Sequence, residues 1–208
     1  MSLLSATRDR LGREIARSRA RLRHLRQRVF DREALVQAGH TPFEVIHDDG
    51  LVSLRYYLPL AEDEIELADG RRVEVAATTQ RTPLVIVPPL AVNMLIYDLF
   101  PERSLVRYLR ARGFELYLVD WGRPSRAQDD LQLADYFDRF LPAALDRVRA
   151  HSGVERLNLH GWSFGGLFGL CHAAIAPEGI ANLVLVGTPV DYHDNGVLGE
   201  RYKALARA

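Results

Sequence analysis

The hydrophobic and polar positions of the first 38 residues predict one amphipathic helix. Side chains that are apolar except for Ser18 recur between Leu11 and Val29 at spacings of four, three, four, three and four. This periodicity lines one face of a helix. The same 38 residues contain ten arginines and four acidic residues. We therefore expect a helix over residues 5–36 with one apolar and one basic face.

The pattern changes to a period of two between residues 41 and 87. Four strand-like runs lie at residues 43–46, 51–58, 64–67 and 72–76. Asp49-Gly50 and Asp69-Gly70 supply residues that tolerate the positive φ of tight turns. These runs predict an antiparallel opening to a sheet. The continuous apolar run 83–87, which ends in two prolines, predicts a strand that is buried on both faces.

Predicted helices and strands alternate from residue 100 onward. We expect helices over residues 101–112, 133–150 and 164–176, and strands over residues 115–119, 156–160 and 182–186. Pro142 is expected to kink or split the second helix. Alternation of this kind predicts an α/β fold with a mostly parallel sheet and helices on both faces. The chain thus divides into a basic amphipathic helix, residues 1–38, and an α/β core, residues 39–208.

Composition narrows the function classes. The 208 residues are 48% hydrophobic and 26% charged, which is typical of a globular chain. The formal net charge is zero, so the whole molecule has no bias toward nucleic acid. A single cysteine excludes a disulfide framework and suits a reducing cytoplasm. No apolar run approaches the ~20 residues of a transmembrane segment, and we expect a cytoplasmic protein without metal or cofactor.

The pattern Gly161-x-Ser163-x-Gly165 lies between a predicted strand and a predicted helix. This arrangement predicts a nucleophile elbow, a sharp turn that presents a serine hydroxyl above the sheet. Ser163 is the candidate nucleophile, and the backbone N–H of Phe164 is one candidate donor to an oxyanion. Leu90 N–H is the second, because the two prolines before it cannot donate. The alternative is a glycine-rich turn that only packs tightly.

The general base is harder to place, because only 45 residues follow Ser163. His193, which follows the last predicted strand, is the candidate base. His160 is expected to be structural, and His172 lies nine positions after Ser163, out of phase on the same helix. Asp120 ends a strand but precedes the serine in the chain.

Residues 83–193 resemble the polyhydroxyalkanoate synthase family of the α/β-hydrolases. The matching segments are residues 84–89, 98–99, 103–106, 119–124, 135–136 and 185–191, together with the elbow. In that family an elbow nucleophile accepts a 3-hydroxyacyl group from a coenzyme A thioester and passes it to a growing polyester. The family's nucleophile is a cysteine, whereas position 163 is serine. Its acid and histidine lie in a later stretch, so the resemblance implies an α/β-hydrolase core that is incomplete at the C-terminus after about six strands.

The expected function is acyl transfer or ester hydrolysis by a serine nucleophile. By resemblance, the substrates are hydroxyacyl esters or thioesters, including polyester, with acyl-coenzyme A as a candidate substrate. The basic helix is expected to pack on its own domain or a partner helix, or to bind a polyester granule or another lipid-like surface. Nucleic acid is disfavoured, because Phe30 is the only aromatic residue in residues 1–38. The alternative function is a non-catalytic fragment or interaction protein without a complete triad.

Overall fold

The chain divides into two compact units, residues 1–38 and 39–208. The structure, a computed structural model, describes residues 37–191, 194 and 196–205. The predicted helix over residues 5–36 and the candidate base His193 lie outside the described residues. All described helices and strands belong to the second unit.

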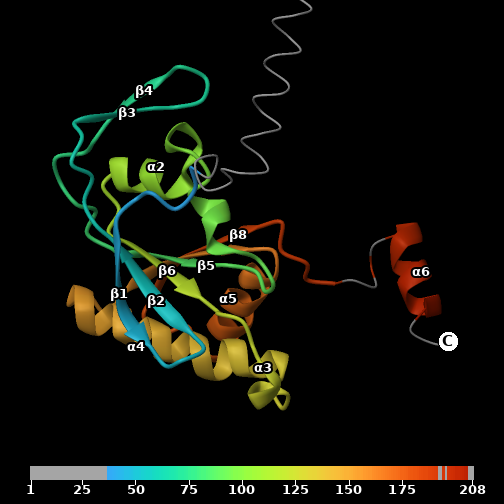
Figure 1. The fold of residues 1–208 in the computed structure, drawn as a ribbon. Coiled ribbons are helices and arrows are strands. Elements are labelled where there is room, and N and C mark those ends of the chain that lie inside the picture. Colours follow the sequence, from blue (N-terminus) through green and yellow to red (C-terminus); the bar gives the residue numbers. More distant parts are fainter. Residues whose placement is uncertain (1–36, 192–193, 195, 206–208) are drawn as a thin grey trace, which may run out of the picture. The chain divides into compact units, whose positions relative to one another are not determined.

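A six-stranded sheet forms the centre of this unit, in the order β1-β2-β6-β5-β7-β8 (Figure 1). Its strands are β1 (Phe43–Asp48), β2 (Ser53–Tyr57), β5 (Leu84–Val87), β6 (Leu116–Asp120), β7 (Leu157–Trp162) and β8 (Ile180–Val186). The last four strands run parallel, whereas β1 and β2 pair antiparallel with each other and β2 pairs antiparallel with β6. The mostly parallel sheet agrees with the prediction.

One predicted hairpin does not join this sheet. β3 (Glu64–Glu66) and β4 (Arg72–Glu74) pair with each other in a separate two-stranded sheet. Each contributes only three residues, and Ile65 is their one buried side chain. The pair contacts the helix α2 (Leu105–Ala111). The sequence pattern therefore identified the turn correctly, but the antiparallel opening of the main sheet consists of β1 and β2 alone.

One predicted helix begins later than expected and another is interrupted, each for a local reason. Residues 101–103 form a 3₁₀ turn, and α2 starts at Leu105 because the Ser104 hydroxyl accepts a hydrogen bond from the Arg107 amide at 3.0 Å. The expected helix over residues 133–150 is split into α3 (Leu133–Asp135), a π-helical turn (Tyr136–Phe140) and α4 (Leu141–Ser152). Pro142 lies in the first turn of α4, where its missing N–H is tolerated.

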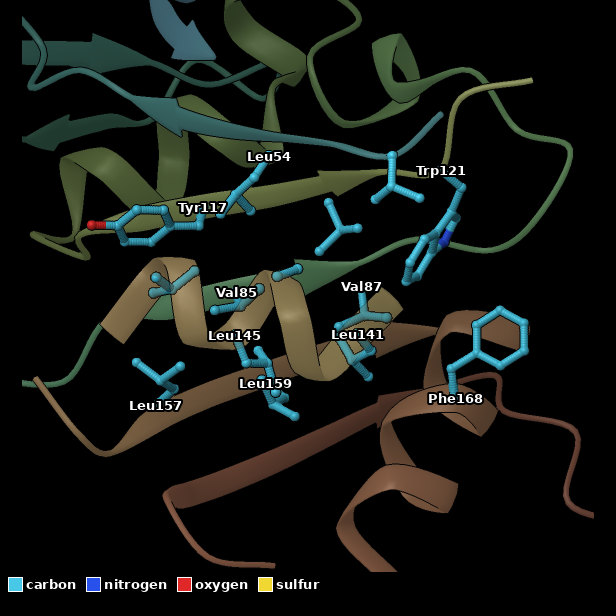
Figure 2. Packing of buried hydrophobic residues seen from close by; sticks show 14 of the residues in the cluster. Leu54, Val85, Val87, Tyr117, Trp121, Leu141, Leu145, Leu157, Leu159 and Phe168 are labelled. Carbon is cyan, nitrogen blue, oxygen red and sulfur yellow. The ribbon is translucent and has the colours of Figure 1, made fainter. Parts of the chain in front are cut away.

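Helices cover both faces of the sheet. α4 and α5 (Phe164–Ile175) pack on one face, where their side chains meet Val85 and Leu159 in a continuous apolar cluster (Figure 2). On the other face, α2 and the 3₁₀ segment Met94–Tyr97 pack against Ile86. β5 is thus buried on both faces, as its uninterrupted apolar sequence predicted. The last helix, α6, spans Gly196–Leu205.

The strand order places a topological switch point beside β5. The chain leaves β5 toward β6 on one side, and it leaves β7 toward β8 on the other. Loops that diverge from neighbouring parallel strands open a crevice at the carboxyl ends of those strands. The loop after β5 and the turn after β7 both lie at this edge. The topology therefore brings the candidate nucleophile and the candidate oxyanion loop to one place.

The buried face of β7 yields the first testable prediction. Leu159→Ala removes a side chain with no exposed surface from the middle of the core, and we expect it to lower the free energy of unfolding by about 2–5 kcal/mol. Val45→Ala, at a side chain that is 53% exposed on β1, should change it by less than about 0.5 kcal/mol. Urea denaturation measures both. Equal effects of the two substitutions would contradict this description of the core.

Candidate functional site

Ser163 occupies a strained junction between a strand and a helix. β7 ends at Trp162 and α5 begins at Phe164, so the serine is the single residue between them. Its backbone has φ +52° and ψ −122°. A non-glycine residue in such a region costs of order 1–3 kcal/mol and persists only when its surroundings hold it. The Ser163 amide donates to the Val186 carbonyl at 2.8 Å, and its carbonyl accepts from the Gly166 amide at 2.9 Å.

Three glycines allow the strand and the helix to approach each other. A Cβ atom at Gly161 would lie 2.4 Å from the Cα of Gly166. One at Gly166 would lie 1.9 Å from Oγ1 of Thr188, and one at Gly165 would lie 2.0 Å from the carbonyl oxygen of Val87. Real Cβ contacts are not this short, so Gly161 and Gly165, which meet backbone atoms, exclude a side chain, whereas at Gly166 the Thr188 side chain would have to move. Tight packing alone would suit either interpretation of the turn, but the positive φ of Ser163 is typical of an elbow.

The loop after β5 lies against the start of α5. The hypothetical Cβ of Gly165 would also approach the Pro88 carbonyl oxygen, at 2.6 Å. The chain then continues through Leu90 to Ala91, whose φ is +58°. Ser163 and Ala91 are the only non-glycine residues with positive φ in the described part of the chain. The structure thus brings together the two segments that carry the predicted donors, Leu90 and Phe164.

The position of Phe164 suits an anion. It is the first residue of a 12-residue helix, where backbone N–H groups and the helix dipole favour negative charge. Its side chain packs against the core cluster, as does that of Leu90. Both candidate donors are therefore carried by segments that are anchored in the core rather than by exposed loops.

A cavity of about 720 Å³ adjoins the loop. Its lining consists of Arg55, residues 90–94, residues 120–124 and Tyr136. Arg55 and Asp120 form an ion pair on its wall, with about a fifth of each side chain exposed. Sequence reasoning missed Arg55. The pairing of β2 with β6 brings it beside Asp120, 65 positions away, and no local pattern signals such a contact.

The described histidines do not serve Ser163. The buried Nδ1 of His160 has no hydrogen-bond partner among the described residues. His172 is buried on α5 and forms a hydrogen bond with the Phe137 backbone. Burial lowers the pKa of both imidazoles, so both are held neutral. Within the described ranges, no histidine is hydrogen-bonded to the Ser163 hydroxyl, and the serine side chain does not cap α5. Asp120 forms an ion pair with Arg55.

Two features are absent from the described residues. No group of three or more His, Cys, Asp or Glu side chains there is arranged to hold a metal ion. No helix in the same residues is long and apolar enough to cross a membrane.

The close packing of α5 against the backbone at the end of β5 can be tested by substitution. Gly165→Ala forces a methyl group into the Val87 carbonyl, and we expect a loss of about 3 kcal/mol or more in unfolding free energy. Gly153→Ala is the matched control: its φ is +70° and no atom lies within 4 Å of the added Cβ, so only about 1 kcal/mol of backbone strain is expected. Thermal and urea denaturation report both. A Gly165→Ala protein as stable as the control would contradict the close approach.

Comparison with known proteins shows which family the chain belongs to. Residues 82–201 match the family described as the alpha/beta hydrolase fold. The poly(3-hydroxyalkanoate) polymerase subunit PhaC of Haloferax mediterranei is 34% identical over 80% of this chain and 31% of its own length. The corresponding subunit of Thiocystis violacea is 30% identical over 91% of this chain and 49% of its length, and that of Allochromatium vinosum is 37% identical over 64% and 37%.

Among solved structures, an alpha/beta hydrolase enzyme from a lagoon-sediment metagenome is 16% identical, with a TM-score of 0.44 over 80% of this chain and 59% of the other. The chain spans about half, or less, of the length of the curated relatives just named. The resemblance predicted from the sequence is confirmed, and so is the predicted fold. The chain belongs to the α/β-hydrolase family, within which it is similar to the poly(3-hydroxyalkanoate) polymerases.

Proposed function

We propose that Ser163 is the nucleophile of an acyl-transfer reaction and that the Leu90 and Phe164 amides bind its oxyanion. The observation that carries this proposal is the Ser163 backbone, held at φ +52° between β7 and α5. Backbone strain at this serine, which lies at the carboxyl edge of a parallel sheet, is explained if the serine must present its hydroxyl to a substrate. The cavity of about 720 Å³ is lined by Leu90, not by Ser163, and it offers room for an acyl group beside the proposed oxyanion loop.

The chemistry follows from these positions. A general base takes the Ser163 hydroxyl proton as the oxygen attacks the acyl carbonyl, whose oxygen becomes an anion. The two backbone N–H groups stabilise that anion, and removing one such donor typically costs ~3 kcal/mol in the transition state. The carbonyl re-forms as the bond to the leaving group breaks, and the protonated base gives its proton to that group, which departs as a thiol or an alcohol. Water or an alcohol then attacks the acyl-enzyme by the same steps and releases serine.

The substrate class comes from the relatives. They are poly(3-hydroxyalkanoate) polymerases, which supports hydroxyacyl esters or thioesters as substrates of this chain. A serine requires a base to deprotonate it, whereas a thiol ionises more readily, so position 163 favours oxygen esters. Acyl-coenzyme A remains a candidate acyl donor. The reaction needs no cofactor, and the single cysteine suits a reducing cytoplasm.

The general base is assigned to a histidine outside the described residues. His193 is the candidate within the sequence, and the relatives extend well beyond the matched segment. If no such histidine completes the site, the protein is a non-catalytic member that keeps the fold and binds a partner. The observation favouring this second function is the lack of any described histidine at the Ser163 hydroxyl.

Labelling with a fluorophosphonate separates the two functions. We expect intact-mass analysis to show one phosphonyl adduct on the wild-type chain and none on Ser163→Ala, because only an activated serine reacts. Circular dichroism of both samples controls for folding. Labelling of Ser163→Ala at the wild-type rate would contradict Ser163 as the nucleophile. A folded wild-type chain that stays unlabelled would favour the non-catalytic function.

We further propose that residues 1–38 bind a polyester granule or another lipid-like surface. Ten arginines and a regular apolar face support this, since basic amphipathic helices bind anionic interfaces. We expect the chain to sediment with vesicles that contain anionic lipid, and less so as salt is raised. Neutral vesicles serve as the control. Failure to bind anionic vesicles at low salt would contradict this surface role.

A further inference from the structure

We propose that Trp121 is a positioning residue for the oxyanion-binding loop, because its indole N–H fixes the peptide that leads to Leu90. The inference rests on the proposed function of Ser163 and Leu90. The Trp121 Nε1 atom donates a hydrogen bond to the Pro88 carbonyl oxygen at 2.8 Å, and both residues are buried. Trp121 lies 33 positions from Pro88 in the sequence, and its hydrogen bond is made to the loop, so it acts through the loop.

The loop depends on an external donor because it has few of its own. Pro88 and Pro89 have no N–H group and cannot contribute one to a turn. Residues 90–91 form a turn directly after these two prolines. Two residues after Ala91, the Asn93 side chain accepts a hydrogen bond from the Leu95 amide at 3.0 Å and caps the next helical turn. The loop is therefore held at its start by Trp121 and at its end by the Asn93 cap.

Between these two anchors lies the strained residue Ala91, at φ +58°. An alanine adopts this conformation only when the flanking structure imposes it, since glycine alone accepts it without a steric penalty. The peptide before Ala91 carries the Leu90 carbonyl, and the peptide before that carries the Leu90 N–H. Trp121 holds the Pro88 carbonyl before Leu90, and the cap at Asn93 holds the chain after it. These two contacts together determine the direction of the Leu90 N–H.

The turn after β6 aims the indole at this carbonyl. Asp120 accepts from the Gly122 amide at 3.0 Å through Oδ1 and pairs with Arg55 through Oδ2. Gly122 has φ +62°, and a Cβ there would lie 2.0 Å from the Leu51 carbonyl, so only glycine fits. Each residue of the Asp120-Trp121-Gly122 sequence therefore has a separate task. The acid and the glycine shape the turn, and the tryptophan holds the loop.

The ring of Trp121 also contacts the elbow helix. It packs edge-on against Phe168 of α5 at a centroid distance of 5.9 Å, and against Tyr136 at 5.4 Å. Figure 2 shows Trp121 and Phe168 facing each other at the end of the core cluster where β6 ends. One side chain thus connects the loop that carries Leu90 to the helix that begins at Phe164. Both proposed oxyanion donors are fixed relative to this single ring.

The test removes the indole N–H and keeps an aromatic ring. In Trp121→Phe we expect the Leu90 amide resonance to shift in a ¹⁵N–¹H spectrum. With the p-nitrophenyl ester of 3-hydroxybutyrate, kcat should fall by about 10- to 100-fold while KM changes by less than about threefold, as for a displaced transition-state donor. Val148→Ala is the control: this buried residue of α4 belongs to the same core cluster, and its loss destabilises the fold without touching the loop. It should leave both the Leu90 resonance and kcat close to wild type.

The outcomes separate this inference from the proposed function. An unshifted Leu90 resonance in Trp121→Phe would overturn the positioning role, whatever the activity. A shifted resonance with unchanged kcat would overturn it too, because Leu90 would then be positioned without serving the reaction. A wild-type chain that neither hydrolyses the ester nor reacts with a fluorophosphonate would contradict the proposed function. In that case the Leu90 resonance still reports whether Trp121 positions the loop.

Discussion

The close approach of the α5 N-terminus to the backbone that leaves β5 is the constraint on which the rest of the site depends. Gly165 lies against the carbonyls of Val87 and Pro88, and no side chain fits between them. This contact joins the turn after β7 to the loop after β5 at the switch point of the sheet. It also makes the turn so sharp that Ser163 must adopt a positive φ. Without the glycines, the serine and the loop would separate.

Packing of the core holds the strained backbone at Ser163 and Ala91 in place. Ser163 and Ala91 both hold conformations that cost a non-glycine residue of order 1–3 kcal/mol. The segments beneath them, β5 and β7, are central strands with helices packed on both faces of β5. A deformable edge strand could not impose such geometry. The packed core therefore holds the backbone at Ser163 and Ala91 in place, and under the proposed function this rigidity is the condition for electrostatic stabilisation of an oxyanion.

The sequence predicted the features that arise from local spacing. The elbow glycines, the buried β5 and the break at Pro142 all follow from residues near one another, and the structure contains them. Long-range contacts could not be predicted. The Arg55–Asp120 pair and the Trp121–Pro88 hydrogen bond join residues 65 and 33 positions apart, and β3 pairs with β4 away from the main sheet. His193 lies outside the described residues, so the base stays a prediction.

The central claim is that Ser163 faces two backbone donors that are fixed in advance. A crystal structure of the protein after reaction with a fluorophosphonate tests it most directly, because the phosphonyl oxygen takes the place of the oxyanion. If both amides bind the oxyanion, this oxygen lies about 2.7–3.1 Å from the amide nitrogens of both Leu90 and Phe164, with the loop unmoved. A phosphonyl oxygen directed to solvent, or bound by one amide after a rearranged loop, would show that the two donors are not fixed in advance.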